Sequence, residues 1–252
     1  WAEMPVQSLP GWLRRRLRGI WGEESVQAIE AAHHRTPPLD LSLKPGKSAP
    51  EGAEPIASSW RLPAGVQVSA LPGFAEGDWW IQDAAAALPA TLLNVQPGEA
   101  VLDLCAAPGG KTMQLAAMGA EVTALDLSAA RLNRLAENLA RTGLTAQVVT
   151  ADALDWTPPA PVDAVLLDAP CSATGTIRRH PDLPFVRKPA DVEALTALQA
   201  KLLDRALGFL KPGGRLVYCT CSLLPEEGEG QVAAALLRHP GLIAETPALP
   251  LG

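Results

Sequence analysis

Hydrophobic and polar positions follow two different patterns along the chain, and the pattern changes near residue 100. Before that point, helical spacing between residues 9 and 35 predicts two short helices, and alternation at Leu39–Leu43 predicts a strand. The Pro- and Gly-rich stretch 44–55 predicts a loop, residues 66–69 a short strand, and residues 81–93 a helix that leads into the second region.

From residue 100 onward, short apolar runs alternate with amphipathic segments, which is the pattern of a parallel sheet covered by helices. The predicted strands are Val101–Leu104, Glu121–Leu125, Gln147–Thr150, Ala164–Leu167, Arg215–Cys219 and a short one at Leu242–Ala244. The predicted helices are Lys111–Met118, a segment capped by Ser128 that ends at Gly143, Ala190–Leu210 and Glu229–Arg238. The fold class is therefore α/β. We place a domain boundary near Phe74, between a small N-terminal helical and α+β segment (1–73) and a sheet domain (74–252).

The stretch from Val101 to Thr112 predicts a strand, a tight turn and a helix, and the second region is organised around it. Gly109 and Gly110 allow the backbone to approach a ligand, and the first N–H groups of the following helix have no partners inside that helix. The phosphate-loop pattern G-x-x-x-x-G-K-[ST] fits except that Cys105 stands at its first glycine, and the dinucleotide pattern G-x-G-x-x-G does not fit. A phosphate-loop NTPase and an adenosyl-methionine-dependent methyltransferase both stay open at this point.

Acidic residues follow three of the predicted strands, at the edge where open parallel sheets bind ligands. Asp126 is placed to accept hydrogen bonds from a ribose diol, and Asp152 to accept one from an adenine amino group. Each could instead only cap a helix or solvate a loop, but their register with the Gly-rich turn favours a nucleoside site. Asp168 could be the metal-binding acid of an NTPase, but the Pro170-Cys171 pair after it does not fit that class.

The composition is that of a globular protein: 48% of the 252 residues are hydrophobic and 19% are charged, which suits one large α/β domain with a smaller companion. No apolar run is long enough to span a bilayer and no leader-like segment opens the chain, so we expect a cytoplasmic protein without membrane contact. The four cysteines have neither the spacing of a disulfide framework nor that of a zinc site, so free thiols and no metal are expected. We expect a monomer.

The formal net charge of −6 argues against nucleic-acid binding over the whole surface, but two local basic clusters stand out. One contains Arg14 and Arg15, and the other contains Arg178, Arg179 and His180. Either cluster could contact RNA phosphates or could form a solvated face. Only one Tyr and three Phe are present, so a base-stacking platform is not expected.

Two cysteines follow predicted strands and are expected to face the ligand edge of the sheet. Cys171 follows the fourth strand and Cys221 the fifth, whereas Cys219 lies inside a strand and is expected to pack. If one of them is a nucleophile, the residues alone leave open which of the two thiols would attack.

Several motifs, taken in order, resemble those of the Sun-type RNA (cytosine-C5) methyltransferases, and in particular the bacterial branch that acts on small-subunit ribosomal RNA. They are DLCAAPGGKT at Asp103–Thr112, DAPCSATG at Asp168–Gly175, RRHPD at Arg178–Asp182 and YCTCS at Tyr218–Ser222. The likeness runs from about Leu39 to His239, and Pro72-Gly73-Phe74 with Gln82-Asp83 matches the family's lead-in segment.

The resemblance implies a Rossmann-like methyltransferase sheet with a small N-terminal α+β subdomain, the cofactor S-adenosyl-methionine, and formation of 5-methylcytosine in RNA through a covalent cysteine–cytosine adduct. It implies that Cys221 is the nucleophile and that Cys171 assists release of the product. The chemistry adds Lys111 as a positive charge and Asp168 as a partner of the cytosine ring. The cofactor-binding residues are then Cys105, Ala106, Ala107, Pro108, Gly109, Gly110, Lys111, Asp126, Asp152 and Asp168.

We expect 16S ribosomal RNA as the substrate, contacted through Arg178, Arg179, His180, Arg14 and Arg15, with tRNA as an alternative. The helical domain that precedes this region in the family and the last strands of its sheet are missing from this sequence. We therefore expect the domain 74–252 to be truncated at its C-terminal end and RNA binding to be weak. A phosphate-loop NTPase and a catalytically inactive RNA-binding subunit are the alternatives, and the two intact thiols argue against the second.

Overall fold

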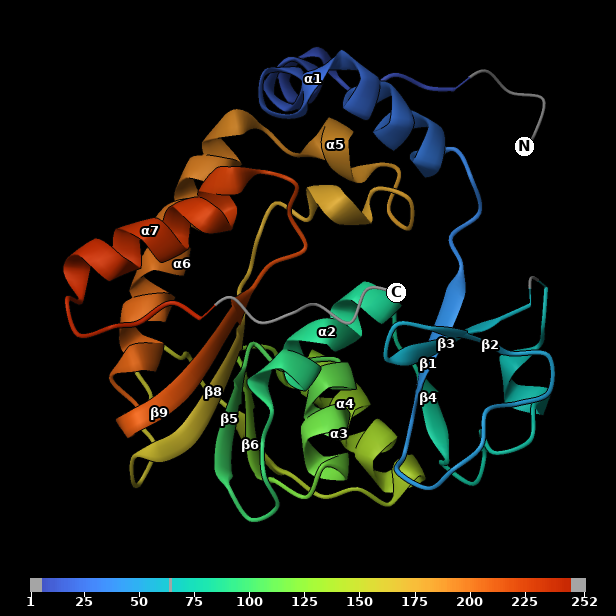
Figure 1. Cartoon of the computed structure of the whole chain (residues 1–252), viewed down its shortest axis with the longest axis vertical. Helices are drawn as coiled ribbons and strands as arrows, with labels where there is room; N and C mark the ends of the chain where they lie inside the picture. The colour runs from blue at the N-terminus through green and yellow to red at the C-terminus, as the bar shows by residue number, and fades with distance from the viewer. Residues whose placement is uncertain (1–5, 64, 246–252) are drawn as a thin grey trace. The chain divides into compact units, whose positions relative to one another are not determined.

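The computed structural model describes residues 6–63 and 65–245, which form two compact units built from interleaved segments (Figure 1). The α1 unit combines the chain up to Pro37 with Pro170–Ala200 and Thr220–Ala244. The sheet unit holds Pro38–Ala169 and Lys201–Cys219. Each unit thus combines segments that lie apart in the sequence. The domain boundary near Phe74 stays a prediction.

The large sheet of the sheet unit has five parallel strands in the order β7-β6-β5-β8-β9. They are β5 (Ala100–Leu104), β6 (Glu121–Asp126), β7 (Gln147–Thr150), β8 (Val162–Asp168) and β9 (Leu210–Cys219). The first strand in sequence, β5, lies in the middle, so the chain runs outward to β7 and then returns to the other side. This is the Rossmann-like arrangement predicted from the sequence, and the carboxyl ends of β5, β6 and β8 meet at its ligand-binding edge.

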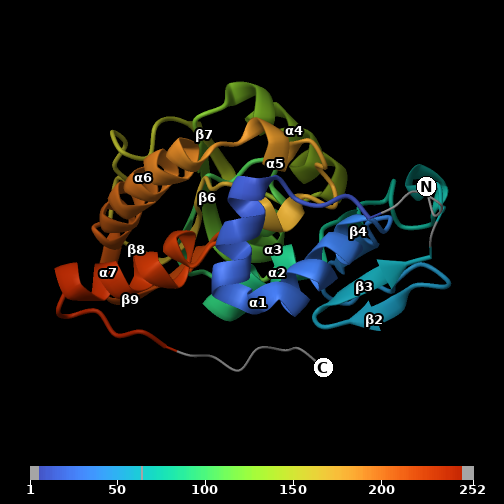
Figure 2. The same cartoon turned by 90° about the horizontal axis from the view of Figure 1, so that it is seen from above.

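Helices cover this sheet because parallel strands are joined by crossover connections, which usually contain a helix. The helices α2 (Ala84–Leu93), α3 (Gly110–Ala117) and α4 (Ala129–Thr142) lie on one face, and the C-terminal part of α6 (Pro189–Leu207) lies on the other (Figure 2). The core between α4 and the sheet contains Leu132, Leu135 and Leu139. As predicted, Ser128 caps α4 by accepting a hydrogen bond from the Arg131 N–H, and Gly143 ends it in the left-handed conformation.

A small antiparallel sheet, in the order β2-β3-β1-β4, also belongs to the sheet unit. Its strands are β1 (Leu39–Leu43), β2 (Glu54–Ile56), β3 (Ser59–Leu62) and β4 (Trp79–Ile81). Only β1 was predicted. The strand expected at residues 66–69 is wrong, because a 3-10 turn occupies Val68–Ala70. Strands of three or four residues are too short to show a two-residue period, so their partners define them.

The α1 unit is mostly helical. Its first helix, α1 (Gly11–His33), is interrupted at Gly22, where φ is 82° and ψ is 166°, so the prediction of two short helices is confirmed. The other helices are α5 (Leu183–Val186), the N-terminal part of α6 and α7 (Glu229–Arg238), with 3-10 turns η2 (Thr174–Thr176) and η3 (Pro225–Glu227). Leu13, Leu17, Val26, Ile177, Val192 and Leu224 form its core. The strand predicted at Leu242–Ala244 is wrong, since these residues adopt no strand conformation.

None of the helices in the described ranges, 6–63 and 65–245, has the length and apolar character needed to cross a membrane.

Candidate active site

The turn after β5 adopts a backbone that few residue types allow. Cys105 has φ of 61°, so the position where a phosphate loop has its first glycine is left-handed here as well. Gly109 has φ of 105°, and a Cβ atom on it would lie 2.7 Å from the Leu135 Cγ atom of α4. Only glycine fits both that conformation and that close approach. The turn is thereby held against α4, and α3 begins directly after it at Gly110.

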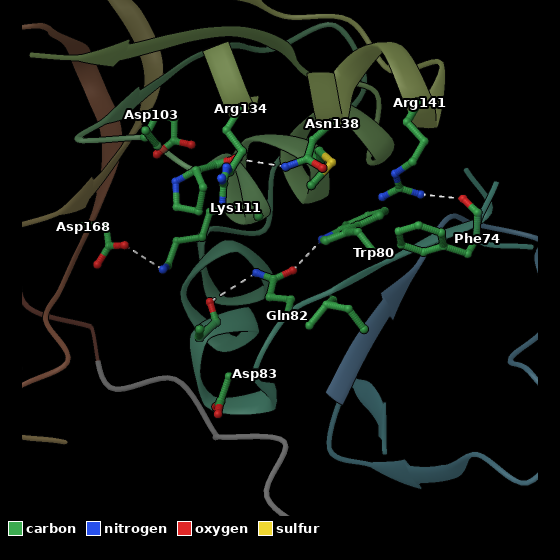
Figure 3. Close-up of a pocket in the computed structure, with 17 residues that line it drawn as sticks. Phe74, Trp80, Gln82, Asp83, Asp103, Lys111, Arg134, Asn138, Arg141 and Asp168 are labelled. Atoms are coloured by element: carbon green, nitrogen blue, oxygen red, sulfur yellow. Dashed lines mark hydrogen bonds and ion pairs between the residues drawn. The ribbon is translucent and has the colours of Figure 1, made fainter. Parts of the chain in front are cut away.

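A cavity of about 480 Å³ lies beside this turn in the sheet unit (Figure 3). Six of the sequence-predicted site residues line it: Ala106, Ala107, Pro108, Gly110, Lys111 and Asp168. The other lining residues are Phe74, Trp80, Ile81, Gln82, Asp83, Ala86, Asp103, Met113, Arg134, Asn138 and Arg141. Apolar walls with a few convergent polar groups are typical of sites for small organic ligands and cofactors.

Asp103, in the buried strand β5, was not among the predicted site residues, yet it has the most unusual environment in the cavity. Its side chain is 0% exposed, and its Oδ2 atom accepts a hydrogen bond of 2.5 Å from the Thr112 hydroxyl. Its Oδ1 atom is buried and has no hydrogen-bond partner among residues 6–63 and 65–245. Burial raises the pKa of this carboxyl to about 7. A charged residue inside an apolar strand is the signal that could have identified Asp103 in the sequence.

Lys111 and Asp168 form an ion pair across the carboxyl ends of β5 and β8. The Lys111 Nζ atom lies 2.8 Å from the Asp168 Oδ2 atom, as Figure 3 shows. Burial by itself would lower the pKa of Lys111, but Asp168 and the other acidic groups nearby together outweigh it, so the pKa of Lys111 is raised and the ammonium stays charged. The Cys219 thiol donates to the Asp168 Oδ1 atom at 3.5 Å. Burial raises the pKa of Cys219 well above its usual range, as suits a packed, unreactive thiol.

The opposite wall of the cavity comes from β4 and the segment before α2. Gln82 accepts hydrogen bonds from the Trp80 indole (2.8 Å) and the Ser42 hydroxyl (2.9 Å), and donates to the Gln114 Oε1 atom (2.6 Å). These contacts fix the amide by both of its ends, so the wall is held rigidly. In the sequence, only the family resemblance of the lead-in segment singled out Gln82.

Four predicted cofactor residues do not line the cavity: Cys105, Gly109, Asp126 and Asp152. The Asp126 carboxylate accepts hydrogen bonds from the Ala107 N–H (3.1 Å) and the Ser128 N–H (2.9 Å), so it stabilises the turn. Asp152 is exposed and accepts from the Leu154 N–H at 2.9 Å, the geometry of a local turn. Burial raises the pKa of the Cys105 thiol to about 12, which makes it unreactive.

The two thiols predicted to carry the chemistry lie together in the α1 unit. The Sγ atoms of Cys171 and Cys221 are 3.4 Å apart. Cys221 is exposed, whereas Cys171 is half-buried. The pKa of Cys171 is raised, first by the hydrogen bond to Cys221 and then by burial. Cys171 is therefore held in its protonated form next to the more accessible thiol.

The predicted RNA-contacting arginines are partly committed to contacts within the α1 unit. Arg14 forms ion pairs with Glu23 and Glu30. The Arg178 guanidinium donates to the carbonyl oxygens of Arg35 (3.1 Å) and Thr36 (2.5 Å). Arg15, Arg179 and His180 are exposed. Arg178 is thus part of the hydrogen-bonded structure of the unit, and Arg179 and His180 lie at its surface.

A family model described as "16S rRNA methyltransferase RsmB/F" matches residues 90–248, which is more than half of the chain. The chain belongs to this family. As an RsmB/F-family chain, it is 42% identical over 250 residues to "Ribosomal RNA small subunit methyltransferase B" of Klebsiella pneumoniae, covering 92% of this chain and 58% of that protein. The protein of the same name from Xanthomonas campestris is 42% identical over 264 residues, covering 96% and 59%.

Solved structures show the same fold. A "Methyltransferase Homolog Protein" from Pyrococcus horikoshii has a TM-score of 0.77 and 30% identity, covering 93% of this chain and 82% of its own. NSun6 from the same organism has a TM-score of 0.81 at 20% identity, covering 98% and 93%, which shows the fold alone. The chain spans less than two thirds of the length of the curated RsmB/F relatives named above.

Proposed function

We propose that this chain carries the catalytic core of an S-adenosyl-methionine-dependent RNA methyltransferase that forms 5-methylcytosine in 16S ribosomal RNA. The observation that carries the proposal is the thiol pair, Cys171 and Cys221, with Sγ atoms 3.4 Å apart. Methylation at a carbon of the cytosine ring needs a nucleophile that attacks and a second group that assists release, and one exposed thiol beside one protonated thiol meets both needs.

The cavity of the sheet unit suits the cofactor. Its turn presents small residues from Ala106 to Gly110, and the buried Asp103 Oδ1 atom offers an acceptor that no group of the described residues uses. Asp103 and the turn would hold the amino-acid end, with Asp126 supporting the turn and Asp152 as the proposed partner of the adenine. When bound, the cofactor supplies an electrophilic methyl group.

The protein's own groups account for the remaining steps. The Cys221 thiolate adds to carbon 6 of cytosine, and the electron pair displaced from the ring double bond makes carbon 5 nucleophilic, so that carbon 5 takes the methyl group. A base then removes the carbon 5 proton, the double bond re-forms, and the carbon–sulfur bond breaks with assistance from Cys171. Asp168, paired with Lys111 at 2.8 Å, orients the cytosine by hydrogen bonding.

The alternatives have less support. A phosphate-loop NTPase is disfavoured because the matching family is one of methyltransferases. An inactive RNA-binding subunit would have no use for two adjacent thiols. Bisulfite mapping of cellular RNA with and without the gene distinguishes 16S ribosomal RNA from tRNA as the substrate.

The test of the mechanism uses two single variants and their double variant as the control. With RNA and S-adenosyl-methionine, Cys171→Ala should stall after methyl transfer and accumulate a protein–RNA adduct that survives denaturing electrophoresis. Cys221→Ala should abolish methylation and form no adduct, and the double variant should form none either. An adduct with Cys221→Ala but not with Cys171→Ala would reverse the two roles, and no adduct in either would leave the covalent route without support.

A further inference from the structure

The most elaborate polar network of the α1 unit surrounds Glu227, at the end of η3. Its side chain is 0% exposed. The Oε1 atom accepts hydrogen bonds from the Ser172 N–H (2.8 Å) and the Gln199 side-chain amide (3.0 Å). The Oε2 atom accepts from the Ser222 hydroxyl (2.5 Å) and from the Ser172 hydroxyl. Four donors from three separate segments therefore meet at one buried carboxylate.

Two of these segments carry the reactive thiols. Ser172 directly follows Cys171, and Ser222 directly follows Cys221. Gln199, which also donates to Glu227, donates to the Pro170 carbonyl oxygen at 2.8 Å. Ser172 and Ser222, which follow the two thiols, thus donate hydrogen bonds to Glu227. Pro170, which precedes Cys171, accepts one from Gln199.

Direct contacts between the two thiol segments complete the arrangement. The Gly175 N–H donates to the Cys221 carbonyl oxygen at 2.9 Å, and a Cβ atom on Gly175 would lie 2.8 Å from that oxygen, so the approach requires glycine. The Leu223 N–H donates to the Thr174 hydroxyl at 2.8 Å. These direct contacts and the hydrogen bonds to Glu227 therefore link the same two segments, whose thiols lie 3.4 Å apart.

A carboxylate suits this network because it only accepts hydrogen bonds and offers two oxygens to the four donors. A glutamine could keep the two bonds to the Oε1 atom and turn its NH₂ group toward the Ser172 and Ser222 hydroxyls, which can also accept. Only a side chain without polar atoms therefore removes the network. Burying a carboxylate is unfavourable compared with an apolar side chain of similar size, so stability of the unit alone does not explain Glu227.

We propose that Glu227 is a positioning residue that sets the spacing and orientation of the Cys171 and Cys221 thiols. The effect of Glu227 on catalysis rests on the function proposed above, whereas its effect on the distance between the two sulfur atoms does not. Loss of the carboxylate releases one or both thiol segments, and the sulfur atoms move apart while the rest of the unit stays folded.

The test compares Glu227→Leu, which removes both acceptor oxygens, with Glu226→Leu. Glu226 is the neighbouring carboxylate on the same turn and pairs with Arg16, away from the network. Reduced protein, without RNA or cofactor, is treated with the short bifunctional thiol reagent dibromobimane. Mass spectrometry of the peptides then gives the ratio of Cys171–Cys221 cross-link to single alkylation, and thermal denaturation reports folding.

Glu227→Leu should lower that ratio about tenfold, the size expected when buried donors lose their acceptor, and Glu226→Leu should leave it unchanged. A folded Glu227→Leu protein with the wild-type ratio overturns the proposal. If Glu227→Leu does not fold, Ser222→Ala, which removes one donor, decides: about a threefold drop supports the proposal and the wild-type ratio overturns it. If neither variant folds, Glu227 serves the core of the unit instead, which also overturns it.

The positioning role of Glu227 and the proposed function can be refuted independently of each other. A wild-type protein that cross-links efficiently but never methylates RNA would refute the function and leave the positioning role intact. If the wild type methylates, Glu227→Leu should lower kcat more than it raises KM for RNA, because the thiols act in the chemical steps and not in RNA binding.

Discussion

The buried carboxyl of Asp103 makes the stability of the protein depend on pH in a predictable direction. Its pKa in the folded protein is about 7, against an ordinary value of 3.8, because burial disfavours the charged form. A pKa raised by folding means that the folded state holds the proton more tightly than the unfolded state. Its contribution to stability is therefore complete below pH 3.8 and is lost as the pH rises to about 7.

Linkage converts the two pKa values into a measurable effect. Between pH 5.5 and pH 8 the carboxyl should lower the free energy of unfolding by about 2 kcal/mol. Asp103→Asn removes this titration and keeps an acceptor for the Thr112 hydroxyl. The difference in unfolding free energy between Asp103→Asn and wild type, from urea denaturation, should therefore shift by about 2 kcal/mol in favour of the variant over that range.

The matched control is Asp155→Asn, the same substitution at an exposed position of the same unit. Binding supplies a second readout. If the unpartnered Oδ1 atom accepts from a bound cofactor, the affinity for S-adenosyl-homocysteine should rise about tenfold from pH 6 to pH 8, as the ionised fraction of a carboxyl with a pKa of about 7 does. An unfolding difference independent of pH would refute the reasoning on Asp103.

Three further predictions concern the turn and the RNA surface. Gly109→Ala should lower the free energy of unfolding by about 2–3 kcal/mol in urea denaturation, because its Cβ atom would meet Leu135. The control Gly143→Ala has open space around the new Cβ atom and should cost about 1 kcal/mol. Equal costs for the two variants would contradict this reasoning. Asp126→Ala should weaken S-adenosyl-homocysteine binding by about 1–3 kcal/mol in calorimetry, because the Ala107 N–H loses its acceptor. Unchanged affinity would show that the turn keeps its conformation without the Asp126 carboxylate. Arg179→Ala should reduce RNA affinity and the salt dependence of that affinity in filter binding. Arg178→Ala should mainly lower thermal stability, because the Arg178 guanidinium donates hydrogen bonds to backbone carbonyl oxygens. Equal losses of RNA affinity in the two variants would instead indicate that both side chains contact RNA phosphates.

The amino-acid sequence by itself determined the large sheet and the location of the site. Its strands are runs of apolar residues and its helices have local caps such as Ser128, so short-range pattern was enough. Parallel strands place their carboxyl ends at one edge, which brought the Gly-rich turn, Lys111 and Asp168 to one cavity. The family motifs supplied the pair of thiols.

Tertiary structure alone decided the features that depend on partners distant in sequence. The short strands β2, β3 and β4 exist through pairing, which no local period shows. Asp103 is exceptional because of its burial, and Asp126 supports a turn because Ala107, 19 residues earlier, points its N–H at it. Ser172 lies 55 residues before Glu227 and Gln199 lies 28 before it. The network around Glu227 cannot be predicted from local sequence. Its contacts join segments that are distant in the sequence, and no local pattern in one segment identifies the other.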